Sequence, residues 1–315
     1  MRFSRRKFLS LSAAALLAPS LGSARTLLSG PAFGSGWHGV LGAPGNAGIL
    51  EDVIAQTIGW IDELFSPYRG TSYLSRFNRA EGLDWQSVPG EFADLAAYSL
   101  ALSERTKGAF DPTVGPLVNR FGFGPIRGQA GGVEGIEIRD RELRKRRPGL
   151  TLDLNGVAKG RALDIMVDRL ARRGVRDVLL ELGGEVRCLG VHPSGRPWQI
   201  GVEDPRPETD GIHRVIAPGL RAVATSGHAT QSYGTVSHLI DPRLGASADP
   251  RLASVTVLAA TAREADGLAT ALAAFGPVDG PAFAIDQRFD ALFLLRDGAA
   301  ITDLTTGAFS DFIQA

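Results

Sequence analysis

The order in which helical and strand patterns follow one another constrains this fold more than any other feature of the sequence. Apolar residues recur at helical spacing in four stretches, at 51–65, 91–106, 163–170 and 263–275, the last with Gly276 as its expected end. Strand patterns cover 37–41, 178–182, 185–189 and 254–260, and a strand-turn-strand pattern covers 291–303. The two kinds of element are mixed without strict alternation, which favours an α+β fold over a doubly wound parallel sheet.

The composition allows these elements to form a packed core. Of the 315 residues, 44 % are hydrophobic and 22 % are charged, which is enough to bury a sizeable core. Residues 25–48 are rich in Gly, Ala and Ser, and we expect a linker there before the first strand. No internal repeat is visible, so we predict one domain over residues 25–315.

The first 24 residues have the pattern of an export signal. Arg5-Arg6-Lys7 precede an apolar stretch at 11–17, and small residues up to Ala24 suit cleavage. The paired arginines resemble a bacterial twin-arginine signal, which exports folded proteins; the alternative is the basic start of a general secretory signal. The apolar stretch is shorter than the roughly 20 residues that span a bilayer. We therefore expect a periplasmic protein without a stable membrane anchor.

The charge distribution argues against a nucleic-acid partner. Basic and acidic residues number 34 each, but residues 1–24 hold four basic residues and no acidic one, so the remainder is slightly acidic. Nucleic-acid binding needs a basic face that neutralises phosphates. The one strongly basic run, 139–147, precedes Pro148-Gly149, and we expect it to be a solvated loop or hairpin.

Cys188 is the only cysteine and lies in an expected strand. It cannot form an internal disulfide, and we expect a small buried hydrophobe. The exported fold must then rely on its packed core alone.

Two glycine-rich segments have a composition suited to an anion. GAFDPTVGP at 108–116 follows an expected helix, and DLNGVAKG at 153–160 leads into one. Glycines let the backbone approach a phosphate, and a helix N-terminus offers unpaired N–H groups. Lys159 adds a positive charge. Neither segment matches a dinucleotide fingerprint or a P-loop, and either one alone is equally compatible with an ordinary turn.

His238 is the histidine with the most suggestive neighbours. It lies in SHLIDPR at 237–243, after ATSG at 224–227 and directly before an Asp-Pro turn. A histidine there can act as a base near neutral pH, although a lone histidine is more often structural. The other histidines have no clear partners in the sequence: His38, His192, His213 and His228.

Asp266 and Thr270 form a candidate metal pair. They are four residues apart on the expected helix at 263–275, and therefore share a face that borders its apolar stripe. A carboxylate at the edge of a core is costly unless it finds a partner. Hard oxygens in this position suit Mg²⁺, and an exposed Asp-Thr pair is the alternative.

Taken together, these segments resemble the ApbE family, the FAD:protein FMN transferases. The resemblance covers residues 33–309 and rests on motifs in the family's order: FSPYR at 65–69 with SRFN at 75–78, GAFDPTVGP, DLNGVAKG, LGGE at 182–185, ATSG, SHLIDPR and EADGLATAL at 264–272. It implies an α+β, T-fold-like single catalytic domain, with mixed or antiparallel sheets flanked by helices.

The resemblance also implies an activity. Members cleave FAD with Mg²⁺ and pass the FMN half to a Thr or Ser hydroxyl of a target flavoprotein, releasing AMP. With an export signal, the acceptor is expected to be a redox protein that faces the periplasm. Two alternatives stay open, namely an exported FAD carrier without chemistry and an FAD pyrophosphatase that releases FMN and AMP.

Carried over by motif, the resemblance assigns roles to individual residues. The metal ligands would be Asp266, Thr270 and the main-chain carbonyl of Gly156, and His238 would be the base for the acceptor hydroxyl. The expected FAD contacts are Phe33, Tyr68, Ala109, Phe110, Asp111, Asp153, Lys159 and the backbone around Ile240. The rings of Tyr68 and Phe110 are suited to stacking on the flavin or adenine, with a core position as the alternative.

The sequence departs from the family's pattern at three positions. Glu185 replaces the usual Asp of LGGD, Leu244 replaces a Thr after DPR, and Phe33 stands where Met is more common. None of the three is part of the metal pair or His238, so we expect an active enzyme.

Overall fold

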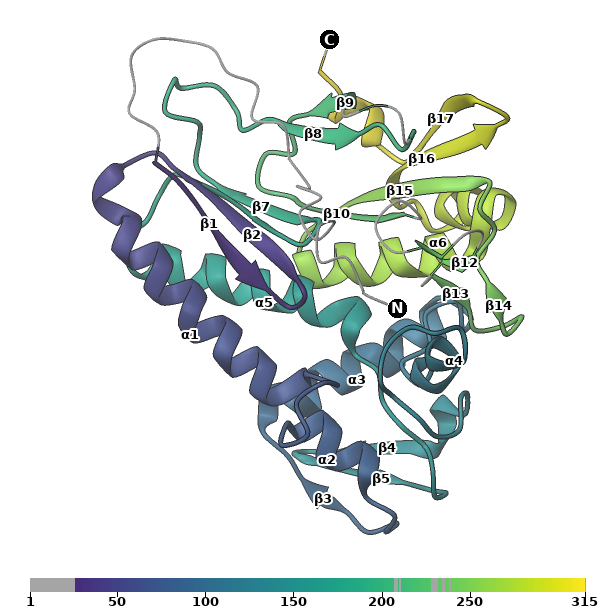
Figure 1. Cartoon of the computed structure of the whole chain (residues 1–315). Helices are drawn as coiled ribbons and strands as arrows, with labels where there is room; N and C mark the ends of the chain where they lie inside the picture. Colours follow the sequence, from purple (N-terminus) through teal and green to yellow (C-terminus); the bar gives the residue numbers. More distant parts are fainter. Residues whose placement is uncertain are drawn as a thin grey trace, which may run out of the picture.

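One antiparallel sheet of eight strands forms the centre of the part of the chain that the structure describes (Figure 1). The structure is a computed structural model and describes residues 26–206, 209, 211–227, 232–233, 236–237 and 239–314. In spatial order the strands are β1 (Thr26–Ala32), β2 (Ser35–Leu41), β6 (Val178–Leu182), β7 (Glu185–Leu189), β10 (Ala222–Gly227), β15 (Leu252–Ala259), β16 (Asp290–Asp297) and β17 (Ala300–Thr306). Every neighbouring pair is antiparallel.

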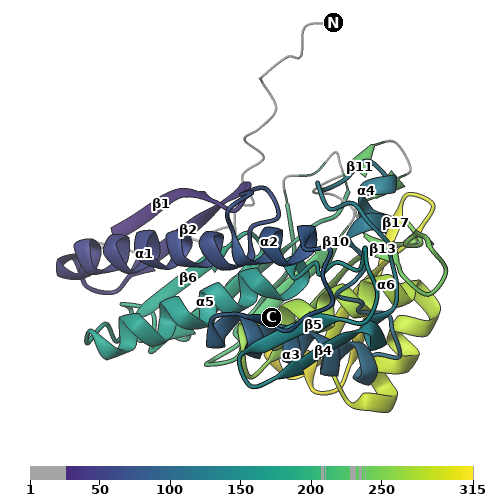
Figure 2. The same ribbon diagram turned by 90° about the horizontal axis from the view of Figure 1, so that it is seen from below.

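The helices lie mainly on one side of this sheet (Figures 1 and 2). They are α1 (Ala47–Phe65), α2 (Tyr73–Arg79), α3 (Gly90–Arg105), α4 (Gly115–Arg120), α5 (Asn155–Arg172) and α6 (Ala262–Gln287), with short 3₁₀ turns η1 (Pro44–Asn46), η2 (Val133–Gly135) and η3 (Phe309–Phe312). α5 and α6 contact each other and pack against the central strands, and α1 packs against α5. The sheet and these helices together confirm the α+β prediction.

Smaller sheets complete the described structure. They are β3 (Gln86–Ser87), β5 (Glu142–Lys145) and β4 (Ile136–Arg139) in one sheet, and the pairs β8 (Ile200–Glu203) with β9 (Ile212–Ile216), β11 (Ser232–Tyr233) with β12 (Val236–Ser237), and β13 (Ile240–Asp241) with β14 (Ala246–Ser247). The β13–β14 hairpin becomes important below because it carries Ile240.

Apolar side chains fill both faces of the sheet. Side chains alternate between the two faces of a strand, so β6 places Leu180 and Leu182 in the core beneath α5 and α6, and Leu179 in a second core on the other face. Cys188 is completely buried in this second core, which confirms its prediction as a small buried hydrophobe. A sheet covered on both faces gives the helices and turns at its ends a rigid support.

The expected linker at the start of the chain is instead the edge strand β1. Thr26–Ala32 pairs with β2 through a tight turn at Phe33-Gly34, where both residues have positive φ values of 48° and 79°. The prediction was wrong because this strand carries Gly30 and Pro31, which weaken the strand signal in a sequence. In the fold, its side chains alternate in burial, as in other strands. The expected signal at 1–24 lies outside the described residues.

Gly276 bends α6 and does not end it as predicted. Its φ of 79° and ψ of −168° are not helical, and the helix resumes at Pro277 and continues to Gln287. Proline is favoured in the first turn of a helix, because the N–H groups there have no acceptor within the helix and the one that proline lacks is not needed. α6 is also long and apolar enough to cross a membrane by length and composition, with 61 % of its most apolar stretch buried inside the fold.

The basic run at 139–147 is a hairpin, as predicted, but one of its cations points inward. Lys145 is fully buried, and its Nζ donates to the carbonyl oxygens of Asn78 (3.0 Å) and Ala80 (2.9 Å) at the end of α2. Burial lowers the pKa of Lys145 to about 8. The side chain thus ties the small sheet to α2 at the cost of a desolvated charge.

We expect Lys145 to make stability depend on pH in the alkaline range. The unfolded chain holds this proton up to a pH of about 10.4, whereas the folded chain releases it near pH 8. The unfolded state therefore binds more protons in this window, and the contribution of Lys145 to the free energy of unfolding rises with pH, by at most about 1.4 kcal/mol per pH unit.

The measurement is the difference between the wild type and Lys145→Met in urea unfolding at several pH values. Burial raises the pKa of the Cys188 thiol to about 12, which acts in the opposite direction but equally in both proteins. Wild-type stability relative to the variant should rise between pH 8 and 10. A constant difference would mean that Lys145 titrates normally in the fold.

Candidate active site

α5 and α6 touch backbone to backbone near their N-terminal ends. A Cβ added at Gly160 would lie 2.3 Å from the carbonyl oxygen of Ala262, so only glycine permits this approach. Asp164, one turn further along α5, accepts hydrogen bonds from the main-chain N–H groups of Ala262 (2.8 Å) and Arg263 (3.0 Å). These N–H groups have no partner within their own helix, and Asp164 satisfies them from α5. The two helices are therefore fixed in register where the candidate site lies.

Three residues predicted as metal ligands are placed around this helix contact. Asp266 on α6 is buried, and its Oδ2 accepts a hydrogen bond from the N–H of Gly160 at 3.0 Å. Thr270 lies one turn later on α6 and faces Gly156, because a Cβ added at Gly156 would come within 3.2 Å of Thr270 Oγ1. The same added atom would come within 3.1 Å of the ring of Phe110, so this predicted FAD contact lies beside them.

Lys159, whose side chain is partly exposed, forms an ion pair with the buried Glu185 beside Asp266. Lys159 Nζ donates to both carboxylate oxygens of Glu185, at 2.7 and 2.9 Å, and to the carbonyl of Gly183 at 3.0 Å. Burial raises the pKa of Glu185 and of Asp266, and the positive charge of Lys159 opposes both shifts. Burial alone would lower the pKa of Lys159, but the charges of Glu185 and Asp266 raise it overall. Glu185, which replaces the family's usual Asp, is thus the acidic partner of this ammonium.

Both N–H groups of the Gly183-Gly184 turn between β6 and β7 are hydrogen-bonded within the protein. The N–H of Gly183 donates to the carbonyl of Gly36 (3.1 Å), and that of Gly184 donates to Glu181 Oε1 (2.8 Å). Both glycines have positive φ values, 63° and 108°, which explains their presence without an anion. A Cβ at Gly183 would lie 2.7 Å from Ser35 Oγ, which places the turn containing Phe33 next to Lys159.

The loop after α3 meets the N-terminal end of α5. Ala109 and Phe110 are buried, and Asp111 Oδ1 accepts hydrogen bonds from the N–H (2.7 Å) and hydroxyl (2.6 Å) of Thr113. The N–H of Asp153 donates to the carbonyl of Pro112 at 2.6 Å, joining the two glycine-rich segments. Burial raises the pKa of Asp153, and the N–H of Asn155, which donates to Asp153 Oδ1 at 3.0 Å, opposes the shift.

The β13–β14 hairpin closes another side of this loop. Ile240 is buried, and Asp241 in the same strand holds Arg243 through an ion pair of 2.8 Å. The guanidinium of Arg243 stacks over the ring of Phe275, and its side chain lies 3.9 Å from a Cβ added at Gly108. The hairpin that carries Ile240 therefore places Arg243 beside Gly108, directly before Ala109–Asp111.

Two predicted site residues remain. Tyr68 is 76 % exposed in the segment after α1, so it is not a core residue. His238 lies outside the described residues, and its role stays a prediction.

The sequence pattern did not point to several residues whose contacts the structure shows. Asp164 and Arg187, which pair at 2.8 Å, could have been suspected only from a carboxylate on the buried face of α5. His38 and His213 have partners that sequence spacing cannot reveal, Glu181 at 2.7 Å and Asp303 at 2.6 Å. Glu181 in turn holds the Gly183-Gly184 turn, which ties His38 to this end of the sheet.

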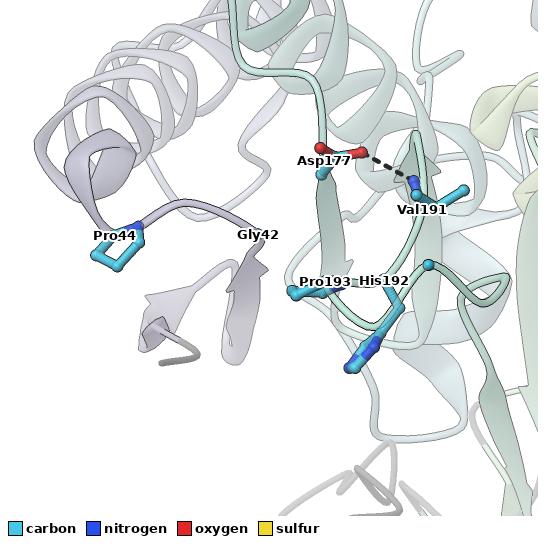
Figure 3. Close-up of a pocket in the computed structure, with 7 residues that line it drawn as sticks. Gly42, Pro44, Asp177, Val191, His192 and Pro193 are labelled. Carbon is cyan, nitrogen blue, oxygen red and sulfur yellow. Dashed lines mark hydrogen bonds between the residues drawn. The ribbon is translucent and has the colours of Figure 1, made fainter. Parts of the chain in front are cut away.

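A hollow lies at the end of β2, β6 and β7 away from the Gly183-Gly184 turn (Figure 3). It has a volume of about 490 Å³ and is lined by Gly42, Pro44, Asp177, Val191, His192, Pro193 and Gly195. Asp177 is engaged within the protein, because its Oδ1 accepts the N–H of Val191 at 2.9 Å. None of the predicted site residues contributes to it.

The helix contact at Gly160 yields a prediction about stability. Gly160→Ala should lower the free energy of unfolding by about 1–3 kcal/mol, because the new methyl group meets backbone of α6 that cannot move independently. The matched control is Gly59→Ala on the exposed side of α1, where nothing lies within 4 Å of the added atom. That change should raise stability by about 0.5–1 kcal/mol. Urea unfolding of both variants checks the opposite signs, and a neutral Gly160→Ala would contradict the close approach.

The fold and the site together define a class of α+β protein in which two core helices meet beside a buried carboxylate, an ammonium and converging glycine-rich loops. The chain belongs to the ApbE family, whose model matches residues 33–293. A FAD:protein FMN transferase from Vibrio cholerae is 32 % identical over 91 % of this chain and 92 % of the relative, and one from Salmonella typhimurium is 29 % identical over 92 % and 90 %.

Solved structures of the family match the fold. The flavin transferase ApbE from Vibrio cholerae superposes with a TM-score of 0.84 at 32 % identity, covering 92 % of this chain and 100 % of that one. The apo form of the Pseudomonas stutzeri flavinyl transferase ApbE superposes with a TM-score of 0.82 at 31 % identity, covering 94 % and 99 %. The expected α+β, single-domain ApbE-like fold is thereby confirmed.

Proposed function

We propose that this protein transfers FMN from FAD to a Thr or Ser hydroxyl of a target flavoprotein, with Mg²⁺ as its cofactor and AMP as the second product. The observation that carries the proposal is the joint placement of Gly156, Asp266 and Thr270 where α5 and α6 meet. The curated relatives described above are FAD:protein FMN transferases, and the chain covers about nine-tenths of their length.

The side chains at the helix contact fit a magnesium ion. Among the described residues no group of three or more His, Cys, Asp or Glu is placed to hold a metal, so other ligands are needed. Mg²⁺ is often held by one or two carboxylates, with other oxygens, waters and phosphates completing its shell. Asp266 supplies the carboxylate and Thr270 a hydroxyl.

The third ligand would be the main-chain carbonyl of Gly156, in the first turn of α5. The N–H of Gly160, which is its donor in a regular helix, reaches Asp266 Oδ2 at 3.0 Å, so this carbonyl and the Asp266 carboxylate meet at one turn of α5. A carbonyl oxygen has two lone pairs and can face a cation while it accepts a helical hydrogen bond. When bound, Mg²⁺ would neutralise charge on the FAD pyrophosphate and on the transition state.

The converging loops would bind FAD around the N-terminal end of α5. Ala109, Phe110 and Asp111 come from the loop after α3, Asp153 and Lys159 from the start of α5, and Ile240 from the β13–β14 hairpin. The positive end of the helix dipole and the charge of Lys159 favour the phosphates there. Phe33 is on the neighbouring β1–β2 turn, and the exposed ring of Tyr68 is available to stack on a planar group.

His238 would take the proton from the acceptor hydroxyl, with the imidazole neutral before the step. Its motif supports this role, because Arg243 of the same segment packs beside Gly108. The hydroxyl oxygen would then form the new bond to the phosphorus of the FMN half, and AMP would leave.

We also propose export to the periplasm by the twin-arginine route, with a periplasm-facing redox protein as the acceptor. The support is the Arg5-Arg6 pair followed by the apolar stretch at 11–17. Replacing both arginines by lysine should retain the protein in the cytoplasm of a bacterial host. Undiminished appearance in the periplasmic fraction would contradict the twin-arginine route.

The partition of flavin products tests the activity. The protein is incubated with FAD and Mg²⁺, with and without an acceptor that contains the target Thr, and FAD, FMN and AMP are separated by HPLC. Transfer predicts AMP that depends on the acceptor, with little free FMN. Free FMN in equal amount to AMP without acceptor would indicate a pyrophosphatase, and intact FAD would indicate a carrier.

A further inference from the structure

One partly buried ammonium lies beside two buried carboxylates at this site, and only one of those carboxylates is a proposed metal ligand. Lys159 is the ammonium, Asp266 is the proposed ligand, and Glu185 is the carboxylate that the proposed function does not use. The side chain of Glu185 is 3 % exposed, and a buried carboxylate is retained at a large desolvation cost. Its position therefore calls for a physical reason.

The hydrogen bonds show how the ammonium is shared. Lys159 has three N–H donors, and its three acceptors are the two oxygens of Glu185 and the carbonyl of Gly183. Asp266 receives a hydrogen bond from the main chain of Gly160, and its carboxylate also lies within hydrogen-bond reach of Glu185. Glu185 thus takes two of the three N–H donors of the ammonium, although Lys159 directly precedes Gly160 in the chain and is close enough to stabilise the ionised form of Asp266.

Without Glu185, the nearest carboxylate for this ammonium would be Asp266. Attraction between opposite charges is strong in a site shielded from water, so Lys159 would pair with Asp266 directly. The ammonium would then occupy an oxygen that a cation needs, and its charge would repel the cation.

We propose that Glu185 is a positioning residue that draws the ammonium of Lys159 away from Asp266, so that the ammonium does not take the Asp266 oxygens that a divalent cation needs. The inference rests on the proposed function, because it requires Asp266 to be a metal ligand. It also gives a physical reason for an acid at position 185, beside both Lys159 and Asp266.

The test measures binding of Mn²⁺, which prefers oxygen ligands as Mg²⁺ does, to the full chain without FAD. Free Mn²⁺ is followed by electron paramagnetic resonance. Glu185→Gln should weaken binding by about tenfold or more, a difference of about 1.4 kcal/mol. Adding Lys159→Met to this variant should recover most of the loss, because the competing ammonium is gone. A merely structural role of Glu185 would give no such recovery.

The matched control is Glu91→Gln. Glu91 on α3 holds Arg161 of α5 through two hydrogen bonds of 2.6 and 2.9 Å, two residues along the helix from Lys159. It is a carboxylate of the same kind bound to the same helix, and its loss should leave Mn²⁺ affinity unchanged.

The variant Asp266→Asn distinguishes an error in the proposed metal site from an error in the role of Glu185. If wild type and Asp266→Asn bind Mn²⁺ equally, the proposed metal site is wrong and the role of Glu185 falls with it. If Asp266→Asn loses binding but Glu185→Gln does not, or if Lys159→Met gives no recovery, only the role of Glu185 is overturned. If Glu185→Gln fails to fold, Glu185→Asp replaces it, with a smaller loss and the same recovery expected.

Discussion

Replacing Asp266 with alanine is expected to reduce Mg²⁺-dependent turnover of FAD by at least about 10³-fold while the protein stays folded. A metal ion at a phosphoryl site stabilises the transition state by several kcal/mol, and each 1.4 kcal/mol corresponds to a factor of ten in rate. Asp266 is the only carboxylate among the three proposed ligands, so its loss removes most of the attraction for the cation. Thr270 and a carbonyl alone would hold Mg²⁺ weakly.

The fold is expected to survive this change because burial already disfavours the charge of Asp266. The carboxylate has a pKa raised by burial, and the contact between α5 and α6 is also held by Asp164 and Gly160. Asp286→Ala, at the exposed end of the same helix, is the control and should keep full activity. Steady-state rates at increasing Mg²⁺ and circular dichroism provide the measurements, and normal turnover by Asp266→Ala would refute the metal assignment.

Replacing His238 with alanine is expected to lower the rate of FMN transfer by about 10²–10⁴-fold, the range typical for loss of a general base. FAD affinity should fall far less, because the proposed contacts of FAD lie on the loops around α5 and not on the imidazole. Single-turnover transfer rates and fluorescence titration with FAD separate the two effects.

A second histidine variant controls for general damage to the protein. His213→Gln breaks the pair with Asp303 of β17, away from the helix contact, and should leave transfer unchanged. Equal losses of transfer and of FAD binding in His238→Ala would instead indicate a structural histidine.

Sequence spacing predicted the parts of this site that depend on one helix or one turn. The separation of four residues between Asp266 and Thr270 places both on one face of α6, and helical periodicity is a local property of the chain. The short apolar run at 178–182 and the strand pattern at 185–189 likewise predicted β6 and β7 with their observed bounds. These features need no knowledge of what packs against them.

Long-range pairing could not be predicted in the same way. The bond between Lys159 and Glu185 joins residues 26 positions apart, and Asp164 meets the start of α6 across 98 positions. Spacing carries no information on such contacts. The continuation of α6 beyond Gly276 was also missed, because the sequence signal for a helix end was present but the helix resumes at Pro277.

The glycines of LGGE show how a correct motif can have a different physical basis. The pair fits a motif of the family, and a close approach to a dinucleotide is one reason for glycine. In the structure, Gly183 and Gly184 serve a turn with positive φ, and both N–H groups are bound within the protein. These two reasons can be distinguished only by identifying the hydrogen-bond acceptor of each N–H group in the folded chain.

The intact mass of the acceptor protein, measured after incubation with FAD and this enzyme, tests the central claim most directly. The account predicts a gain of one FMN phosphoester per acceptor, only with Mg²⁺ present, and none when the target Thr is replaced by Val. An acceptor of unchanged mass while FAD is consumed, or a gain that persists without Mg²⁺ or without the hydroxyl, would contradict it.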